Sequence, residues 1–368
     1  MRKEKWSKEK IWEWHRSQPW LRGCNFMGSD CCNRVDQWQE YGFEERFKTV
    51  GEELALASSV GYNSIRIILQ FEVWDQEHDG FMQRLERYIA LAHKNGISTM
   101  VCFGNDCTVP KESEAAPKMG PQRVDVGYHG GRKKSPHGVL TGPGYSILDE
   151  PELAERFCDM VREIINKYAD DSRVVVWDLF NEPGGGKRES RSLPHMIRFF
   201  EIAREIDPIQ PLTACAWDMQ ALCAGRLSEI ETAAFELSDI ISFHCYGAYE
   251  EMIRVIDILK TTYGRPMLCT EWLHRLLHND VESIYPLFYL EEIGCYNWGF
   301  VAGKYQTYEP WDSLWARYEQ GGGKDIDFTK WQHDLFRPSF RPYDPKEIEL
   351  IKRFNHYADE KIRRDDRS

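Results

Sequence analysis

Two glutamates in this sequence stand at the ends of apolar runs, where a pair of carboxyl groups could break a glycosidic bond. Glu182 follows VVVWDLF (174–180) in an Asn-Glu-Pro triplet, and Glu271 lies near the end of PMLCTEW (266–272). Such a bond is broken when one carboxyl group protonates the leaving oxygen while the other attacks the anomeric carbon or activates a water. We expect Glu182 to be the acid/base, kept protonated by burial and nearby negative charge, and Glu271 to be the nucleophile.

Three polar residues in other apolar runs could support this pair. Arg66 lies in NSIRIIL, and His244 and Tyr246 end DIISFHCY. A cation and a hydrogen-bond donor both favour the ionised form of a carboxyl group, so we expect Arg66 and Tyr246 to keep Glu271 ionised. As ordinary core residues, Arg66 would be an ion-pair partner inside the fold and His244 a hydrogen-bonded core histidine.

The segments that carry these residues alternate with helices along the chain. Eight segments are almost continuously apolar, which is typical of parallel strands covered by helices. They cover residues 21–27, 63–69, 97–103, 174–180, 211–217, 239–246, 266–272 and 295–301. Amphipathic patterns typical of helices cover residues 43–60, 81–95, 151–169, 193–206, 249–263 and 281–293. This alternation predicts a (β/α)8 TIM barrel, an α/β fold in which the carboxyl ends of the strands carry the reactive groups.

The other segments extend a minimal barrel without indicating a second domain. We expect one domain over residues 1–368, with the barrel at about 21–301 and a C-terminal wrap at about 302–368 that contains a helix at 344–358. A loop rich in Gly and Pro, residues 104–148, follows the third strand, and loops of this length are usually functional or disordered. A doubly wound open sheet is the alternative fold, although no G-x-G-x-x-G motif opens a helix after the first strand.

Composition disfavours several classes of partner. The net charge of -12 argues against nucleic acid and anionic membranes, which bind basic surfaces. No apolar run approaches the ~18 to 20 residues of a membrane span, and the charged N-terminus is unlike a signal peptide. The 11 cysteines include no Cys-x-x-Cys pair and are expected to be reduced thiols. We therefore expect a cytoplasmic protein with no metal and no cofactor, whose partner is a neutral molecule.

At the residues named above, the sequence resembles the glycoside hydrolases of clan GH-A, the cellulase-like retaining (β/α)8 enzymes that include family five. Those enzymes carry their acid/base in an Asn-Glu-Pro after strand four and their nucleophile on a Glu that ends strand seven. The resemblance extends to Arg66, to the His244-x-Tyr246 pair and to Trp298. It implies that Asn181 binds the 2-hydroxyl of the sugar and that Trp298 forms an apolar platform under the ring.

A closer likeness, covering most of the chain, is to bacterial proteins labelled cellulase-like or 1,4-β-xylanase. The blocks that carry it are GCNF near strand one, WGFVAGKYQTYEPWDS (298–313) and WQHDLF (331–336). The sequence also departs from the family, because the histidine that family five tends to carry near strands three and four is not evident in CFGNDCTVP (102–110). Asn105 and Asp106 stand there instead, which leaves the sugar preference open.

Six further residues at strand ends or on the loops that follow are candidates for sugar contact. For the tryptophans among them, burial in the core is the alternative. The six are Asp30, Trp38, Asn105, Asp106, Trp217 and Trp272.

The sequence thus predicts a retaining β-glycoside hydrolase that acts on a carbohydrate substrate by a two-glutamate double displacement. We expect small glycosides or oligosaccharides as substrates, since long insoluble polymers require a secreted enzyme. The long loop and the wrap could close one end of the cleft, which favours exo action. Three alternatives remain: an endo-β-1,4-glycanase of the xylanase or mannanase type, a transglycosylase with the same residues, and a non-catalytic sugar-binding barrel.

Overall fold

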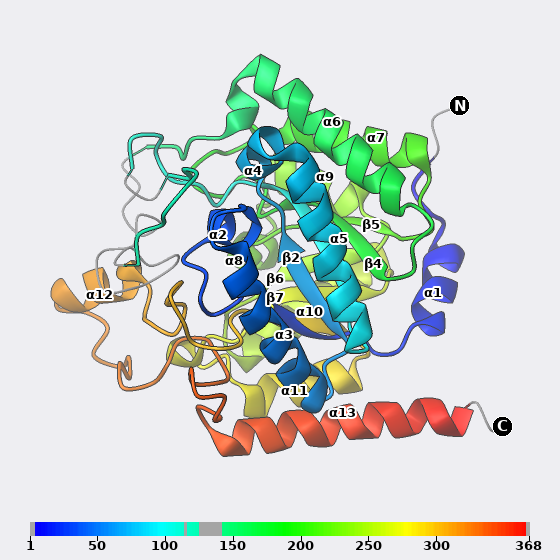
Figure 1. Cartoon of the computed structure of the whole chain (residues 1–368). Coiled ribbons are helices and arrows are strands. Elements are labelled where there is room, and N and C mark those ends of the chain that lie inside the picture. Colours follow the sequence, from blue (N-terminus) through cyan, green and yellow to red (C-terminus); the bar gives the residue numbers. More distant parts are fainter. Residues whose placement is uncertain (1–3, 114–115, 125–141, 366–368) are drawn as a thin grey trace.

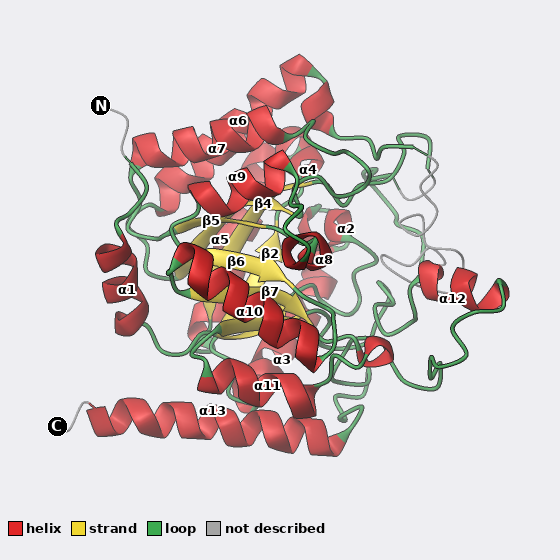
Figure 2. Cartoon of the chain, turned by 180° about the vertical axis from the view of Figure 1, so that it is seen from behind, coloured by secondary structure: helices red, strands yellow, loops and turns green. Residues whose placement is uncertain are grey.

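Eight parallel strands form a nearly closed barrel at the centre of the molecule (Figures 1 and 2). The computed structural model describes residues 4–113, 116–124 and 142–365, with side chains up to residue 361. The strands are β1 (Arg22–Asn25), β2 (Ser64–Ile68), β3 (Ser98–Asn105), β4 (Val174–Asn181), β5 (Leu212–Cys215), β6 (Ile241–His244), β7 (Met267–Trp272) and β8 (Gly294–Asn297). They pair in the order β5-β4-β3-β2-β1-β8-β7-β6, and a bridge between Ala216 and Phe243 joins the two ends. The predicted TIM barrel is confirmed.

Helices surround the barrel and include every helix that the sequence predicts. They are α1 (Lys8–Ser17), α2 (Arg34–Trp38), α3 (Phe43–Ser59), α4 (Phe71–Gln76), α5 (His78–Lys94), α6 (Pro151–Tyr168), α7 (Leu193–Ile206), α8 (Met219–Cys223), α9 (Glu229–Leu237), α10 (Tyr249–Tyr263), α11 (Val281–Leu290), α12 (Asp312–Glu319) and α13 (Pro345–Asp365), with 3-10 turns η2 (Ile147–Asp149) and η3 (Arg275–Leu277). Helix α9, which covers the barrel between β5 and β6, was not among the predicted helices. The helix expected at 344–358 is longer, because α13 continues to Asp365.

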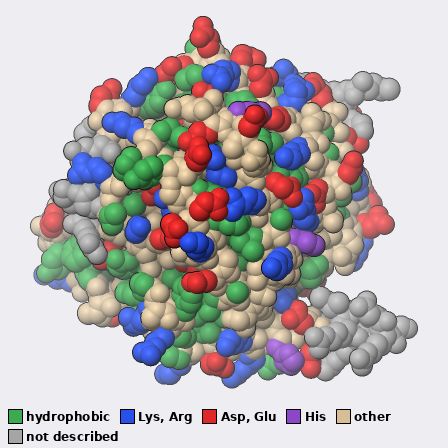
Figure 3. Space-filling view, viewed as in Figure 1, with side chains coloured by type: hydrophobic (Ala, Val, Ile, Leu, Met, Phe, Trp, Pro, Cys, Tyr) green, Lys and Arg blue, Asp and Glu red, His purple; other side chains and the backbone are tan. Residues whose placement is uncertain are grey.

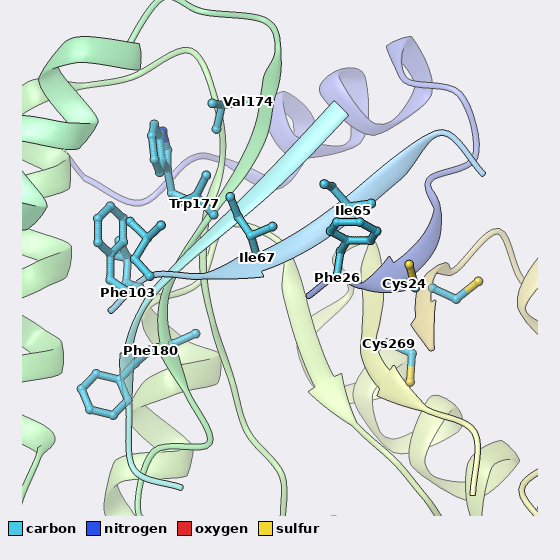
Figure 4. Packing of buried hydrophobic residues seen from close by; sticks show 14 of the residues in the cluster. Cys24, Phe26, Ile65, Ile67, Phe103, Val174, Trp177, Phe180 and Cys269 are labelled. Carbon is cyan, nitrogen blue, oxygen red and sulfur yellow. The ribbon is translucent and has the colours of Figure 1, made fainter. Parts of the chain in front are cut away.

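Alternation along each strand separates the core from the barrel interior. Ile65 and Ile67 on β2 point outward into a large apolar cluster that the strands share with the helices (Figure 4). Burying each of these side chains stabilises the fold by about 1.5–3 kcal/mol. Arg66, between them, must face the inside, because successive residues of a strand point to opposite sides. The apolar pattern of β2 therefore requires Arg66, the only cation in this strand, to lie inside the barrel.

The N-terminal segment closes one end of the barrel. Trp6 and Ile11, the latter on α1, are buried in a second apolar cluster with residues of the strands, namely Leu21, Met100, Val175, Val176, Ile240, Leu268 and Tyr296. In both views α1 lies at the opposite end of the molecule from α12 (Figures 1 and 2). The N-terminal segment therefore covers one end of the barrel, and a functional site can lie only at the other end, where the strands have their carboxyl ends.

The C-terminal extension packs against the barrel along α13. The hydroxyl of Tyr285 on α11 donates to Asn355 Oδ1 at 2.6 Å, and Arg22 on β1 pairs with Asp359 at 2.6 Å.

The loop after β3 has no helix or strand in its described parts before η2, and its residues 125–141 lie outside the described part of the chain. Both segments that the sequence adds to a minimal barrel are thus present in the fold.

Three segments far apart in the sequence are joined at the mouth of the barrel, and we call them the mouth wall: residues 28–39, 116–124 and 303–306. The amide of Lys304 donates to Ser29 O at 2.7 Å, and a Cβ added at Gly303 would lie only 1.9 Å from the same oxygen. Asn33 Nδ2 donates to Gln122 Oε1 at 2.8 Å. The mouth wall therefore connects the loops after β1 and β3 to the C-terminal extension.

The surface carries charges of both signs. On the face seen in Figure 3, Lys and Arg side chains are interspersed with Asp and Glu side chains. Among the described residues, no helix is both long and apolar enough to cross a membrane.

Candidate active site

Glu182 and Glu271 face each other at the mouth of the barrel. Glu271 belongs to β7, and Glu182 directly follows β4, where its N–H donates to Cys215 O at 3.1 Å. Glu182 has a φ of 46°, a left-handed conformation that ends the strand and costs a non-glycine residue about 1 kcal/mol or more. One oxygen of each carboxyl group and one nitrogen of His244 all lie within 4.8 Å of one another. The structure thus brings together the two carboxyl groups that the sequence singled out.

His244 lies between the two carboxyl groups. Its Nδ1 is 2.7 Å from Glu182 Oε1 and 3.4 Å from Glu271 Oε2. Burial lowers the pKa of His244 to about 4, so the ring is neutral at pH 7. The ring can therefore share a proton with Glu182 without adding a positive charge to the site.

Arg66 is the buried cation that joins the nucleophile candidate to its surroundings. Its guanidinium contacts Glu271 Oε1 at 3.0 Å and Asp178 Oδ2 at 2.8 Å. It also donates to Asn181 Oδ1 at 2.6 Å and to Asn25 Oδ1 at 2.7 Å. Arg66 therefore fixes groups on β1, β4 and β7, which is possible only because it points into the barrel.

Tyr246 holds the other oxygen of Glu271. Its hydroxyl donates to Glu271 Oε2 at 2.7 Å. Its ring packs against Trp311 and His333, with ring centroids 5.3 and 5.5 Å away. Both neighbours belong to the C-terminal extension, so the extension helps to position a residue of the site.

Burial raises the pKa of both glutamates. At Glu182, contacts with Cys107 and Arg66 oppose this effect. At Glu271 the negative charge of Glu182 adds to it, while Arg66 and Tyr246 oppose it. The contacts expected to keep Glu271 ionised are present, but desolvation has the larger influence and the pKa of Glu271 is raised. Because the two carboxyl groups are so close, they titrate as a pair.

Trp298 and Asn181 lie beside the pair. Trp298 is 8% exposed, and together with Arg66 and Asn25 it lines a cavity of about 30 Å³. Asn181 donates from Nδ2 to Asn105 Oδ1 at 2.7 Å. Asn105, which the sequence placed on the loop after the third strand, is the last residue of β3 and is thereby brought to the edge of the site.

The structure buries two of the other candidates, Trp38 and Trp272, and leaves Asp30 and Trp217 at least partly exposed. Trp38 and Trp272 are fully enclosed in the apolar core, where Trp272 packs against Tyr285 and Phe288, so neither indole is open to a sugar. Asp30 accepts from Thr49 Oγ1 at 2.8 Å. Trp217 follows β5 and is 40% exposed, open to contact from solvent.

Asp106 is fully buried, and its carboxyl group forms hydrogen bonds with the loop after Glu182, not with solvent. It accepts from Arg188 at 2.8 Å, from Ser192 Oγ at 2.7 Å and from the amide of Gly184 at 2.8 Å. A Cβ at Gly186 would lie 2.4 Å from Asp106 O, so the glycines after Pro183 allow this close approach. Asp106 therefore helps to hold in place the backbone that carries Glu182, the acid/base candidate.

Sequence reasoning missed several residues around the site. Asp178 contacts Arg66, Cys107 donates its thiol to Glu182 Oε2, and Trp311 and His333 support Tyr246. For Asp178 a signal was present, because a charge in the middle of VVVWDLF must have a buried partner. For the other three, no local pattern marks a contact with a residue so distant in the sequence.

Glu182, His244 and Glu271 are also the only group of described residues with three metal-ligating side chains in reach of one another. Carboxylate and neutral imidazole suit several divalent ions. The same atoms are needed for the chemistry of the paired carboxyl groups, and the expected absence of a metal stays a prediction.

Several solved structures have a similar fold. An exo-β-1,4-mannosidase from an Opitutaceae bacterium, strain TAV5, has a TM-score of 0.57 and 16% identity over 92% of this chain and 59% of its own. A Streptomyces cattleya GH5_18 structure in complex with GlcNAc has a TM-score of 0.56 and 11% identity, over 92% and 80%. A β-1,4-D-mannanase from Cryptopygus antarcticus has a TM-score of 0.53 and 11% identity, over 91% and 90%. At these identities the likeness shows the fold alone.

The family of the chain is shown by its sequence. No curated protein sequence matches the chain significantly. The family model described as Cellulase (glycosyl hydrolase family 5) matches residues 25–272, which include β2 to β7, the last residue of β1 and both glutamates. The chain therefore belongs to glycosyl hydrolase family 5, within clan GH-A, and is a glycosidase.

Proposed function

We propose that this glycosidase is a retaining, exo-acting β-glycosidase, with Glu182 as acid/base and Glu271 as nucleophile. The observation that carries the proposal is that one oxygen of each carboxyl group lies within 4.8 Å of the other. Retaining enzymes keep their carboxyl groups about 5 Å apart, whereas inverting enzymes need roughly 6.5–9.5 Å for a water between them. The spacing favours direct attack by Glu271 and a covalent glycosyl-enzyme.

The residues around the pair fit the two steps of this reaction. In the first step Glu271 attacks the anomeric carbon while Glu182, protonated because burial raises its pKa, gives its proton to the leaving oxygen. Arg66 and Tyr246 hold the two oxygens of Glu271 in line for attack. In the second step the ionised Glu182 takes a proton from the water that releases the sugar.

Binding of the sugar would involve Asn181 and Trp298. An amide nitrogen carries two protons, and Asn105 accepts one from Asn181 Nδ2, which leaves the second for the 2-hydroxyl of a sugar. Trp298 lines the small cavity beside Arg66 and offers an apolar ring face. These two roles follow the resemblance to the family, and the positions of both residues support them.

Exo action on small glycosides or oligosaccharides is supported by the mouth wall. Arg34, Gln37 and Tyr305, all from the mouth wall, line the same small cavity as Trp298. A sugar on Trp298 would meet this wall on one side, so a chain of sugars could extend only in other directions. Trp217, which follows β5, offers an exposed apolar side chain for contact with the leaving group.

We expect a screen of aryl β-glycosides and short β-oligosaccharides to yield monosaccharide as the first product. A soluble β-glycan should lose single sugars with little fall in viscosity. Oligosaccharide products and a rapid fall in viscosity would instead indicate an endo-β-1,4-glycanase of the xylanase or mannanase type. Transfer products that dominate at low acceptor concentration would indicate a transglycosylase, and binding without any product a sugar-binding barrel.

Replacing Glu182 by Gln should separate substrates by their leaving groups. Without an acid, kcat/KM on glycosides with poor leaving groups should fall by about 10²- to 10⁴-fold. With a dinitrophenyl leaving group, which departs without a proton, the first step should be almost unchanged and should appear as a burst in stopped-flow absorbance. Equal losses for both kinds of substrate would contradict the role of Glu182 as the acid.

A further inference from the structure

The loop after β3 places a thiol against the acid/base. Cys107 Sγ donates to Glu182 Oε2, while the other oxygen of the same carboxyl group lies 2.7 Å from His244 Nδ1. The carboxyl group of Glu182 is therefore held at both oxygens, by a ring nitrogen on one side and a thiol on the other. No step of the proposed reaction uses this thiol.

The position of Cys107 is fixed by a neighbour that also touches the sugar-binding amide. Asn105 Oδ1 accepts from the amide of Cys107 at 3.1 Å, and Asn105 Nδ2 donates to Cys107 O at 3.0 Å. The same Oδ1 accepts from Asn181 Nδ2 at 2.7 Å. The side chain of Asn105 thus links the backbone of Cys107 to Asn181, which holds the thiol of Cys107 beside the site.

The thiol is in the form that can donate a hydrogen bond. Burial raises the pKa of Cys107 well above its usual value, and the negative charge of Glu182 raises it further. At neutral pH the sulfur therefore keeps its proton. A donor next to a carboxyl group favours the ionised form, so the thiol lowers the pKa of Glu182 against the larger effect of burial.

Cys107 also borders a cavity. Cys107 and Asn105 line a cavity of about 150 Å³, separate in its lining from the smaller one beside Trp298 except for Arg34. Of the eleven cysteines, nine are buried, and only Cys107 and Cys223 are partly exposed. A reagent that enters the larger cavity therefore meets Cys107 directly beside Glu182.

We propose that Cys107 is a positioning residue that orients the carboxyl group of Glu182 for proton transfer, and that covalent occupation of its sulfur blocks that transfer. The inference rests on the proposed role of Glu182 as the acid. It assigns a function in this reaction to a residue on the long loop after β3.

The first test compares Cys107→Ala with Cys107→Ser in the pH profile of kcat/KM. The basic limb reports the protonated acid of the free enzyme. Loss of the donor in Cys107→Ala removes an influence that lowers the pKa of Glu182, so the limb should move to higher pH, by about 0.5–1 unit. The hydroxyl of Cys107→Ser also donates and should return the limb to the parent position or slightly below it.

The same variants should differ in their dependence on the leaving group. With a less well oriented acid, Cys107→Ala should lose about 3- to 10-fold in kcat/KM on glycosides with poor leaving groups and little on dinitrophenyl glycosides. A residue that only supports the fold would lower both alike and would leave the pH limb in place.

The second test uses the parent protein and methyl methanethiosulfonate. The Cys107 thiolate attacks the sulfenyl sulfur, a disulfide to a methylthio group forms, methanesulfinate leaves, and the thiol proton goes to solvent. We expect more than 10-fold loss of activity on poor leaving groups, reversed by dithiothreitol, with a rate that rises with pH as the thiolate forms. Cys223→Ser should be inactivated like the parent, and Cys107→Ser should resist.

The outcomes separate this inference from the proposed function. If Glu182→Gln hydrolyses all glycosides like the parent, Glu182 is not the acid and both fail. If Glu182→Gln shows the leaving-group effect while Cys107→Ala has the parent's pH profile, only the role of Cys107 fails. If Cys107→Ala does not fold, the test with methyl methanethiosulfonate distinguishes the outcomes. The proposal is overturned if mass spectrometry shows the methylthio group on Cys107 and the protein keeps full activity.

Discussion

Replacing Glu271 by Ala should lower kcat on aryl β-glycosides by about 10⁴-fold or more, since the covalent step has no other nucleophile. Azide fits the space left by the carboxyl group and can attack the anomeric carbon from the same side. It should restore turnover and yield a glycosyl azide of inverted configuration, whereas the parent enzyme releases sugar with retained configuration. Product configuration by proton NMR checks both results.

The control for this variant is Glu250→Ala, at an exposed position on α10, which should behave like the parent. An azide product of retained configuration, or hydrolysis by Glu271→Ala as fast as by the parent, would refute the assignment of Glu271. Because Glu271 also accepts from Arg66 and Tyr246, a stability measurement should accompany the kinetics.

Replacing Arg66 by Met should damage both the fold and the reaction. Arg66 and Asp178 have no exposed side-chain surface, and removal of the cation leaves a buried carboxylate without compensation. Breaking such a pair typically costs about 3–5 kcal/mol, so the midpoint of urea unfolding should fall markedly. Activity should fall as well, because Glu271 loses the group that favours its ionised form and aligns one oxygen.

The matched control is Arg198→Met, which removes an arginine that is 45% exposed and pairs with Glu201 at 3.5 Å. Surface pairs of this kind contribute about 0–1 kcal/mol, so its unfolding midpoint should barely move. Adding Asp178→Asn to Arg66→Met should recover part of the lost stability. If the double variant is no more stable than Arg66→Met, an unpaired charge is not the cause.

The barrel could be predicted because its signal is spread over eight segments. Each segment is almost continuously apolar, and a charge such as Arg66 between Ile65 and Ile67 is visible as an interruption. The helix α9 escaped because it has only nine residues, although Ser228 and Glu231 form a capping box that marks its start. Short helices are held mainly by packing, as the burial of Ile230 and Phe235 shows.

The site was predictable where a residue stands at a strand end. Glu182, Glu271 and His244 converge because the carboxyl ends of parallel strands meet at one mouth. Strand position cannot separate Trp298, which lines a cavity, from Trp272, which points into the core, since both are large apolar residues near strand ends. The path of the loop that brings Cys107 to Glu182 has no local signal at all.

Two further expectations depend on quantities that a sequence does not show. The pKa of Glu271 follows from a balance between desolvation and several contacts, and only the burial found in the structure decides its direction. Asp106 is polar and follows a strand, as a sugar contact would, but Arg188 and Ser192 occupy its oxygens. The cytoplasmic location remains a prediction from the reduced cysteines.

The contact of Tyr246 with the extension bears on the order in which the enzyme is made. The last barrel strand ends at Asn297, whereas Trp311 and His333, which pack on Tyr246, are synthesised afterwards. Domains begin to fold while the chain is still emerging from the ribosome. A nascent barrel that already has all eight strands therefore lacks the ring contacts that support Tyr246 until the C-terminal extension has been synthesised.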